Sequence, residues 1–254
     1  MAGMSPPASG LTAVVVSSGL EALLSVCLKS LRRALLRALP EADFEIVVVD
    51  NASDFPYNPG TFIGNGYRLI RFDTHQRFAN ANNVGFARYP NPFCLLLNND
   101  VLLDELSVRH MLRLLVETPS AGICGSRLLF PDGSIQHCGV VLGEGKVGPY
   151  HVKRRCPAHL VPRADVEYQA VTGACMLVRG ELWEELNGLC EDYEFGLEDI
   201  DFCLRARAKG WRVFCSNTTD SLHFEASTPG RSSLDRPSRE LFMRRWQGRY
   251  AIDG

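Results

Sequence analysis

Short apolar runs in the first hundred residues predict buried strands. Residues 11–17 (LTAVVVS), 44–49 (FEIVVV) and 93–97 (FCLLL) are the clearest, and residues 67–72 form a weaker run. Leucines recur at a helical spacing between the first two runs, so a helix is expected there. Strands that alternate with helices predict an α/β protein with an open, mostly parallel sheet flanked by helices.

The rest of the chain contains further predicted elements and two predicted loops. Residues 54–66 and 143–164 are rich in Gly, Pro or Asn, which indicates loops, and we expect the second to be mobile. A helical pattern covers residues 102–116. Residues 166–178 are strand-like, helices begin near residues 180 and 199, and a strand at residues 212–215 leads towards His223.

Polar residues follow the predicted strands. Ser17 and Ser18 end the first strand, Asp50 and Asn51 end the second, and another group ends the fourth, namely Asn98, Asn99 and Asp100. Ligands of open α/β sheets bind outside the carboxyl ends of the strands. The sequence therefore predicts a ligand site where these polar residues meet.

Asp100 is a candidate metal ligand at the end of an apolar strand. Mg²⁺ is typically held by one or two carboxylates together with substrate phosphates, so one Asp can suffice. The alternative is a plain turn, for which Asn-Asn-Asp is also suitable. His223 is a second candidate ligand, although a lone His is more often a structural residue.

A second acidic group comprises Glu198, Asp199 and Asp201, which stand among apolar residues. Such surroundings raise a carboxyl pKa towards the range needed by a general base. Acidic residues also favour helix N-termini, which is the structural alternative. The several Asn residues at 80–83 have the same two interpretations, as donors to an anion or as helix caps.

Composition excludes some classes of protein. The net charge of −2 argues against a nucleic-acid partner. Nine cysteines occur without a CxxC pair, which is typical of reduced, buried thiols and argues against zinc. No run approaches the length of a membrane span, and residues 1–10 do not resemble a signal peptide, so a cytoplasmic protein is expected.

The motifs, taken in order, resemble the family 2 glycosyltransferases, which have the GT-A fold, and within them the rhamnosyltransferase-like branch that builds bacterial surface polysaccharides. The matching pieces are residues 47–51 (VVVDN), 78–83 (FANANN), 95–100 (LLLNND), 130–137 (FPDGSIQH), 172–175 (TGAC), 198–201 (EDID) and His223. The resemblance implies a flexible start at residues 1–10, a nucleotide-binding half at 11–100, an acceptor and catalytic half at 101–227 with a smaller acceptor-side subregion, and a basic tail at 228–254.

The resemblance also implies an inverting transfer of sugar to a hydroxyl, with a role for each motif. Asp199, with Glu198 beside it, would supply the catalytic base. Asp100 and His223 would hold Mn²⁺ or Mg²⁺ against the donor diphosphate, and Asp50 would contact the nucleobase or ribose. The other implied nucleotide-binding residues are Ser17, Ser18, Asn51, Arg77, Asn82, Asn98 and Asn99, and the implied donor-sugar and acceptor segment is Thr172, Gly173 and Ala174.

The implied partners are a dTDP- or UDP-sugar donor, with rhamnose the first expectation, and a glycan or lipid-linked saccharide acceptor. Three departures bear on this expectation: the first strand ends in Ser17-Ser18-Gly19, Arg77 replaces a common Gly, and Asn98-Asn99-Asp100 supplies one carboxylate instead of two. The single carboxylate predicts looser metal binding than a two-acid site.

Other classes fit less well. The loop after the first strand lacks the Gly-rich, Arg-containing sequence of a sugar-nucleotide pyrophosphorylase and the GxGxxG of a dehydrogenase. A glycosidase would also use two carboxylates, but it needs no nucleotide-type sheet. A non-catalytic module that only binds nucleotide sugar stays open. The Arg-rich tail is expected either to rest on the inner membrane surface or to pack on the domain.

Overall fold

The computed structural model describes residues 10–19, 21–144, 148–225 and 231–254. One half of its central sheet is parallel, in the order β3 (Arg68–Phe72), β2 (Phe44–Asn51), β1 (Leu11–Ser17) and β4 (Phe93–Asn98). These strands are the four apolar runs of the sequence. Because parallel strands end on the same side, Ser17, Asp50 and Asn98 come to one edge of the sheet.

The other half of the sheet is mixed. β11 (Cys175–Arg179) runs antiparallel between β4 and β6 (Ala121–Leu129), and β12 (Arg212–His223) lies parallel to β6. The edge strand β10 (Asp165–Tyr168) is antiparallel to β12. The short strands that complete this half are β5 (Val101–Leu102), which pairs with β12, β7 (Ile135–His137), which pairs with β6, and the separate pair β8 (Val140–Leu142) and β9 (Pro149–His151).

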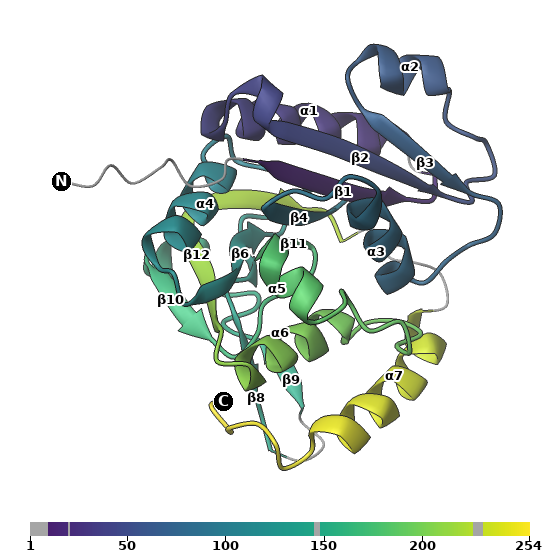
Figure 1. Cartoon of the computed structure of the whole chain (residues 1–254). Coiled ribbons are helices and arrows are strands. Elements are labelled where there is room, and N and C mark those ends of the chain that lie inside the picture. The colour runs from purple at the N-terminus through teal and green to yellow at the C-terminus, as the bar shows by residue number, and fades with distance from the viewer. Residues whose placement is uncertain (1–9, 20, 145–147, 226–230) are drawn as a thin grey trace.

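Helices cover both faces of the sheet, as Figure 1 shows. α1 (Glu21–Ala38) and α4 (Ser107–Glu117) bury their leucines in one apolar core against alternate residues of β1, including Leu11, Ala13 and Val15. Val14 faces the opposite core, to which α3 (Phe78–Arg88), α5 (Gly180–Glu185) and α6 (Glu198–Ala208) contribute. The α/β prediction is therefore confirmed.

Three predictions of local structure are wrong. Residues 54–66 contain the helix α2 (Pro59–Gly64), which packs on β3, and residues 143–164 contain β9 and the 3₁₀ turn η2 (Ala158–Leu160). A second short turn, η1 (Glu41–Asp43), precedes β2. The strand-like stretch at residues 166–178 is two strands, β10 and β11, joined by a loop that contains Thr172 and Gly173. Tertiary pairing decides these elements, which local propensity does not reveal.

The basic tail packs on the domain. Its helix α7 (Arg231–Trp246) lies below α6 in Figure 1, buries Phe242, and donates a hydrogen bond from Trp246 Nε1 to Asp201. Of the apolar residues that the tail could offer to a membrane surface, Leu241, Met243 and Trp246 are packed against the same core. No helix among the described residues is long and apolar enough to cross a bilayer. The expected flexible start falls on residues 1–9, outside the described residues, except for Gly10.

The nine cysteines are free thiols, and seven of them are buried. Burial raises the pKa of the Cys175 and Cys203 thiols to about 12, so both are protonated at neutral pH. The cysteines therefore act as small apolar core residues, as the sequence predicts.

Candidate functional site

The ends of β1 and β4 are joined by polar side chains. Asn99 Nδ2 donates to Ser17 Oγ at 2.8 Å, and Ser17 Oγ lies 2.7 Å from the hydroxyl of Tyr57. Ser17 is buried whereas Ser18 is exposed. Of the two predicted serines, Ser17 therefore fixes the strand ends, and Ser18 is the one open to a ligand.

Asp50 is completely buried at the end of β2. Its carboxylate accepts hydrogen bonds from the backbone amides of Ser53 and Tyr57, and it forms an ion pair with Arg71 of β3. Burial alone would raise the pKa of Asp50, but the hydrogen bonds from Ser53, Arg71 and Tyr57 outweigh it and lower the pKa. Asp50 thus organises the loop after β2, and its predicted contact with a nucleobase or ribose stays a prediction.

Asp100 and His223 meet because β5, which follows Asp100, pairs antiparallel with the end of β12. Val101 lies opposite His223 in this register. Asp100 Oδ1 lies 3.2 Å from His223 Nε2, and both side chains are 7% exposed. Asn98 Nδ2 lies 3.5 Å from the same histidine nitrogen. The structure therefore brings together the two predicted metal ligands, which are 123 positions apart in the sequence.

The Asp100 and His223 pair has the geometry of two adjacent ligands of one cation. Ligands about 2.1 Å from an octahedral ion stand about 3 Å from each other. Within the described part of the chain, His223 Nδ1 is buried without a hydrogen-bond partner, so one of the two ring nitrogens has no structural contact. The described residues include no group of three or more His, Cys, Asp or Glu suited to hold a metal. The remaining ligands would have to come from substrate and water.

Asp199 is held at the start of α6 by backbone amides. Gly173 N donates to Asp199 Oδ2 at 2.7 Å, and Ile200 N donates to Oδ1 at 2.8 Å. Desolvation raises the pKa of Asp199, although these amides oppose the shift. Leu197, directly before the helix, has a left-handed φ of 72°, a strained conformation for a side chain with a Cβ.

Gly173 is required by a close approach to the carboxylate. A Cβ at this position would lie 3.2 Å from Asp199 Cβ and 3.5 Å from the ring of Phe78, which begins α3. Next along the chain, the carbonyl of Ala174 accepts a hydrogen bond from Asn98 N at 2.9 Å. The predicted loop of Thr172, Gly173 and Ala174 therefore connects the end of β4 directly to Asp199.

The other two acids near Asp199 have different surroundings. Glu198 is buried, and its pKa is raised by desolvation and then by the charge of Asp199. Asp201 accepts hydrogen bonds from Tyr193, Arg205 and Trp246, which ties α6 to α7. Asp201 is therefore structural, and Glu198 and Asp199 stay the candidates for the predicted chemistry.

Three predicted nucleotide-binding residues are bonded within the protein. Asn51 exchanges two hydrogen bonds with the backbone of Gln76, and Asn82 donates to the carbonyl of Phe78 one helical turn earlier. Arg77 donates to the carbonyl of Glu191 at 2.8 Å. The helix cap that the sequence offered as the alternative for the Asn residues at 80–83 is not observed, since α3 begins without a capping hydrogen bond from a side chain. A nucleotide role for the three residues stays a prediction.

The sequence reasoning assigned no role to a buried histidine pair next to this site. His137 Nδ1 lies 3.0 Å from His151 Nδ1, and His137 Nε2 accepts a long hydrogen bond from Thr172 N at 3.5 Å. Burial lowers the pKa of both imidazoles, that of His151 to about 4, so both are neutral at pH 7. The signal was present in the FPDGSIQH piece, but only the fold brings residue 151 to it.

The chain is similar in sequence to known proteins. Residues 12–136 match the model of "Glycosyl transferase family 2". The chain is 31% identical over 214 residues to the O-antigen biosynthesis protein RfbC of Myxococcus xanthus, covering 79% of this chain and 16% of that protein. It is 26% identical over 148 residues to the N-acetylglucosaminyl-diphospho-decaprenol L-rhamnosyltransferase of Mycobacterium tuberculosis, covering 54% of this chain and 48% of that protein. The chain thus spans half or less of the length of these relatives.

Solved glycosyltransferase structures share the fold. GalNAc-T7, crystallised with UDP, GalNAc and Mn²⁺, superposes with a TM-score of 0.66 at 12% identity, covering 92% of this chain and 48% of that one. S. aureus TarS with UDP-GlcNAc gives 0.63 at 13% identity, covering 95% and 68%. The mannosyltransferase PcManGT of Pyrobaculum calidifontis, with GDP-Man and Mn²⁺, gives 0.60 at 13% identity, covering 89% and 60%. The fold is the GT-A fold that the resemblance implies.

Proposed function

Because the chain belongs to glycosyl transferase family 2, we propose that it is an inverting, metal-dependent glycosyltransferase that moves a sugar from a nucleoside-diphosphate donor to a saccharide hydroxyl. The observation that carries the proposal is the position of Asp199. Its carboxylate is fixed by Gly173 N, and the same loop is bonded to the strand that delivers Asp100 to His223. A base and a cation site thus adjoin at one sheet edge.

The donor nucleotide would bind over the carboxyl ends of the parallel strands. Asp50 would act there mainly through Tyr57 and Arg71, because its own oxygens accept bonds from the loop and from β3. Ser18 is exposed at the end of β1 and would contact the nucleotide directly. Solved relatives in fold were crystallised with UDP, UDP-GlcNAc or GDP-Man, which supports a nucleotide donor.

Asp100 and His223 would hold Mn²⁺ or Mg²⁺. A divalent cation bound there would offset the negative charge that develops on the departing diphosphate. Two protein ligands are too few to hold a cation tightly on their own. This supports a cation that binds together with the donor diphosphate and is not bound permanently. The Mn²⁺ in two structures of the same fold supports this choice.

Asp199 would remove the proton from the acceptor hydroxyl as that oxygen attacks the anomeric carbon. The bond to the donor diphosphate breaks in the same step, on the opposite face of the sugar, so the configuration is inverted. Burial raises the pKa of Asp199, which makes its carboxylate a stronger base, while two amides keep it ionised and oriented. Glu198 next to it is the second candidate base.

Rhamnose is the proposed sugar and a surface polysaccharide the proposed product, since the relatives named above include an O-antigen biosynthesis protein and an L-rhamnosyltransferase. A cytoplasmic site is proposed, where nucleotide sugars are made. A membrane contact of α7 would rest on its arginines, because its apolar residues pack on the domain.

The test is release of nucleoside diphosphate from dTDP-rhamnose and a panel of UDP-sugars, with Mn²⁺, with Mg²⁺ and with a chelator. Asp199→Asn should lower turnover at least about a hundred-fold while the donor still binds. Asp192→Asn, an exposed acid in the loop before α6, is the matched control. Asp100→Ala and His223→Ala should each weaken the response to metal.

Each part of the proposal fails on a different result. Full turnover in Asp199→Asn would show that another residue is the catalytic base, and Glu198→Gln is then the next variant to measure. A metal response unchanged by Asp100→Ala removes this residue from the cation site. If no donor is consumed but nucleotide sugars raise the melting temperature, the chain is a binding module.

A further inference from the structure

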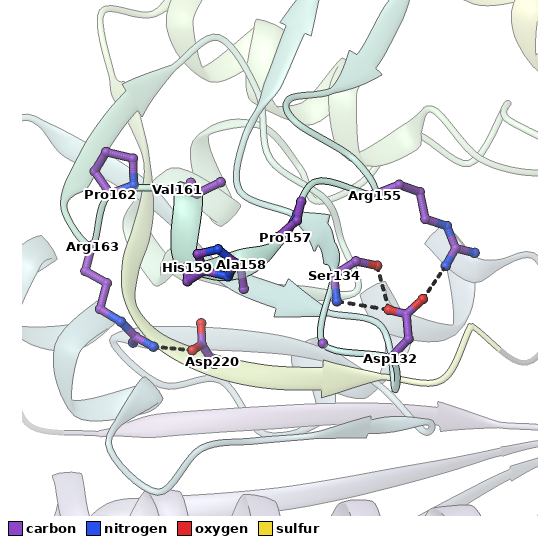
Figure 2. Close-up of a pocket in the computed structure, with 11 residues that line it drawn as sticks. Asp132, Ser134, Arg155, Pro157, Ala158, His159, Val161, Pro162, Arg163 and Asp220 are labelled. Atoms are coloured by element: carbon purple, nitrogen blue, oxygen red, sulfur yellow. Dashed lines mark hydrogen bonds and ion pairs between the residues drawn. The ribbon is translucent and has the colours of Figure 1, made fainter.

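A pocket of about 860 Å³ lies near the end of β6, and none of the predicted site residues lines it, although Asp132, Gly133 and Ser134 belong to the motif at residues 130–137. Its walls are the turn after β6, the segment around η2, and one residue of β12. Figure 2 shows two charge pairs on opposite sides of it, with Ala158 and His159 between them. The lining residues are Asp132, Gly133, Ser134, Arg155, Pro157, Ala158, His159, Val161, Pro162, Arg163 and Asp220.

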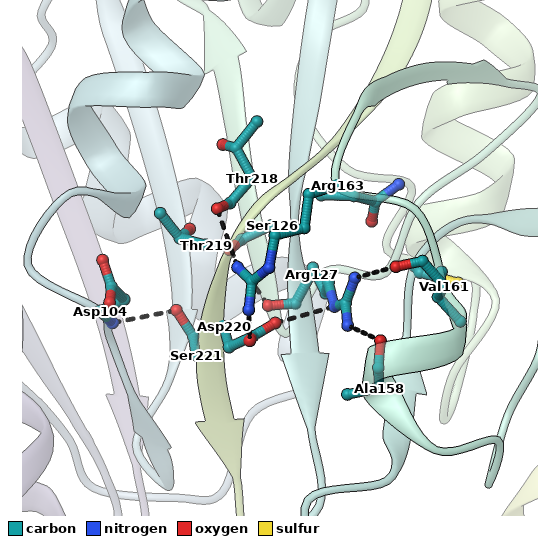
Figure 3. Close-up of polar contacts among 12 residues, drawn as sticks. Asp104, Ser126, Arg127, Ala158, Val161, Arg163, Thr218, Thr219, Asp220 and Ser221 are labelled. Carbon is teal, nitrogen blue, oxygen red and sulfur yellow. Dashed lines mark hydrogen bonds and ion pairs between the residues drawn. The ribbon is translucent and has the colours of Figure 1, made fainter.

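One wall is fixed by a buried arginine. Arg127 of β6 is 1% exposed, and its Nε lies 2.8 Å from Asp220 of β12. Its two terminal nitrogens donate to the carbonyls of Ala158 and Val161, at 2.5 and 3.1 Å, as Figure 3 shows. Burying a guanidinium this completely is costly unless it is paired. Here the carboxylate of Asp220 and two carbonyls supply the partners, although Nε makes no hydrogen bond among the described residues. The η2 segment is thereby tied to the sheet.

The first charge pair extends from this wall to the rim. Arg163 forms an ion pair with Asp220 and donates to the carbonyl of Thr218 at 3.1 Å, as Figure 3 also shows. The arginine is 57% exposed and the aspartate 25%. Both groups therefore face water and can meet a ligand without first leaving the protein interior.

The second charge pair lies across the pocket. Asp132 accepts hydrogen bonds from the amide and hydroxyl of Ser134 and from Arg155 Nη1 at 3.1 Å. The hydrogen bonds from Ser134, followed by Arg155, lower the pKa of Asp132, so it is ionised at neutral pH. The Arg155 guanidinium lies 3.7 Å from the centroid of the Phe130 ring, which orients it. The hydrogen bond to Asp132 uses one of the five N–H donors of this guanidinium.

The chemistry of the lining fits a neutral, polyhydroxylated ligand. The lining itself presents two guanidinium groups and two carboxylates, and the buried Arg127 behind Asp220 adds a third guanidinium. These groups are fixed donors and acceptors on both sides of the pocket, as sugar hydroxyls require. Pro157, Pro162 and Val161 add small apolar surfaces between them. A phosphate or another strong anion is disfavoured, because Asp132 and Asp220 stand next to each arginine.

The pocket is connected to the proposed catalytic loop by a short ribbon. Ser134 bridges to Pro157, and Ile135 N donates to the carbonyl of Cys156 at 2.8 Å. Three residues beyond Ser134, His137 contacts Thr172 N, which adjoins Gly173 and Asp199. An extended segment of three residues spans roughly 10 Å. A ligand in the pocket would therefore be separated from the proposed base by a distance that an oligosaccharide, but not a monosaccharide, covers.

We infer that this pocket binds a neutral sugar unit of the acceptor glycan at a distance from the hydroxyl that is glycosylated. The inference rests on the proposed function, because it assigns the acceptor of that reaction. Binding energy from such a remote unit would orient the growing end of the glycan at Asp199.

The direct test is saccharide binding by saturation-transfer NMR, without donor or turnover. The probes are neutral di- to tetrasaccharides terminating in rhamnose, mannose, galactose or glucose, with inorganic phosphate as the anionic probe. Asp132→Ala and Arg163→Ala should each weaken binding of the best oligosaccharide about ten-fold or more. Arg212→Ala, which breaks a similarly exposed pair with Glu167 on β12 and β10, is the matched control.

The second readout is kinetic and separates the pocket from the catalytic centre. With an oligosaccharide acceptor, both pocket variants should raise the acceptor KM, and leave the donor KM and acceptor-independent donor hydrolysis unchanged. Unaltered oligosaccharide binding in both variants, tighter binding of phosphate than of any saccharide, or no binding of any neutral probe to the wild type would each overturn the inference. A wild-type protein that binds oligosaccharide in this pocket but consumes no donor would defeat the proposed function and leave the pocket assignment intact.

Discussion

In the parallel half of the sheet, the polar residues at the strand ends are bonded mainly to one another. In the mixed half, Glu198 and Asp199 at the start of α6 have raised pKa values. Asp50 has amide and guanidinium partners that lower its pKa. Glu198 and Asp199 have pKa values raised mainly by burial. A polar cluster of the first kind stabilises a scaffold, and one of the second kind is suited to proton transfer.

The two halves also differ in how they assemble their residues. Parallel strands bring their ends together through the local repeat of strand, helix and strand. In the mixed half, antiparallel pairing brings together residues that lie far apart in the sequence. The pairing of β12 with β5, for example, places His223 beside Asp100. The parallel half thus follows from local connectivity, whereas the proposed base and pocket of the mixed half depend on contacts between segments that lie far apart in the sequence.

The largest expected effect is on the platform, through Asp50→Ala. This change leaves two loop amides and Arg71 without their acceptor, and it should lower the free energy of unfolding by about 2–4 kcal/mol. The loss is limited because Arg71 is partly exposed, so water can solvate its guanidinium. The control is Glu45→Ala, also on β2, whose partner Arg68 on β3 is exposed. Chemical denaturation of the two variants compares them, and the control should lose less than about 1 kcal/mol. Equal losses would contradict the scaffold role of Asp50.

The next effect is a pH dependence of stability on the mixed side. The pKa of His151 is lowered to about 4 by burial, whereas an unfolded imidazole titrates near 6.5. Between these values the unfolded chain binds more protons, so stability falls as the pH falls. From about pH 7 to about pH 5 this residue should account for about 2 kcal/mol.

His151→Gln should remove that part of the pH dependence, measured by denaturation at both pH values. The exposed His75→Gln is the control and should keep the wild-type dependence. A His151→Gln protein that loses as much stability on acidification as the wild type would show that the buried pair is not the cause.

A smaller effect is expected where the two halves join, from Gly173→Ala. The added methyl group would contact Asp199 Cβ and Phe78 and displace the carboxylate, which should lower turnover about ten-fold with little change in donor KM. Gly64→Ala in α2, where no atom lies within 4 Å of the new methyl group, is the matched control. Steady-state kinetics on both variants measures the difference, and equal turnover would separate the Gly173 loop from catalysis.

The smallest effect is expected from Arg77→Ala. Its guanidinium donates to the Glu191 carbonyl and lies 3.9 Å from Glu194, at 48% side-chain exposure. Contacts this exposed contribute about 1 kcal/mol or less to the position of a side chain or to the binding of a ligand. The donor KM should therefore change less than about five-fold. A much larger rise in donor KM, with unchanged stability, would support the nucleotide-binding role that the resemblance implies for Arg77.

Much of the parallel half could be predicted from the sequence alone. Apolar runs gave β1, β2 and β4 to within two residues, because a strand buried on both faces must be continuously apolar. α2 was missed because its six residues include two glycines and a proline, which locally favour a loop. η2 was missed because the Arg127 side chain that bonds to it comes from β6, and β9 because three residues are too few to show a strand pattern.

The motif order predicted Asp100, His223, Asp199 and the Gly173 loop as site residues, and the structure brings these four together. The motif order could not separate Asp201 from Glu198 and Asp199. An acidic residue at this place can stabilise a helix terminus, bond to α7 or act as a base, and its residue type does not show which. The motif at residues 130–137 supplies Asp132, Gly133 and Ser134 to the proposed acceptor pocket, but the sequence assigned them no role there. Arg127, Arg155 and Arg163 resemble ordinary surface residues until the fold buries the first and aligns the other two.

The sequence by itself determined the α/β class, the parallel platform and the family, because hydrophobic periodicity and short motifs are local properties of the chain. Only the tertiary structure decided which carboxylates are desolvated, which arginine is buried, and that His223 stands beside Asp100. The reason is that desolvation and pairing depend on which atoms the rest of the chain places within a few ångströms of a group. Antiparallel pairing brings together residues whose separation in the sequence gives no sign of their contact.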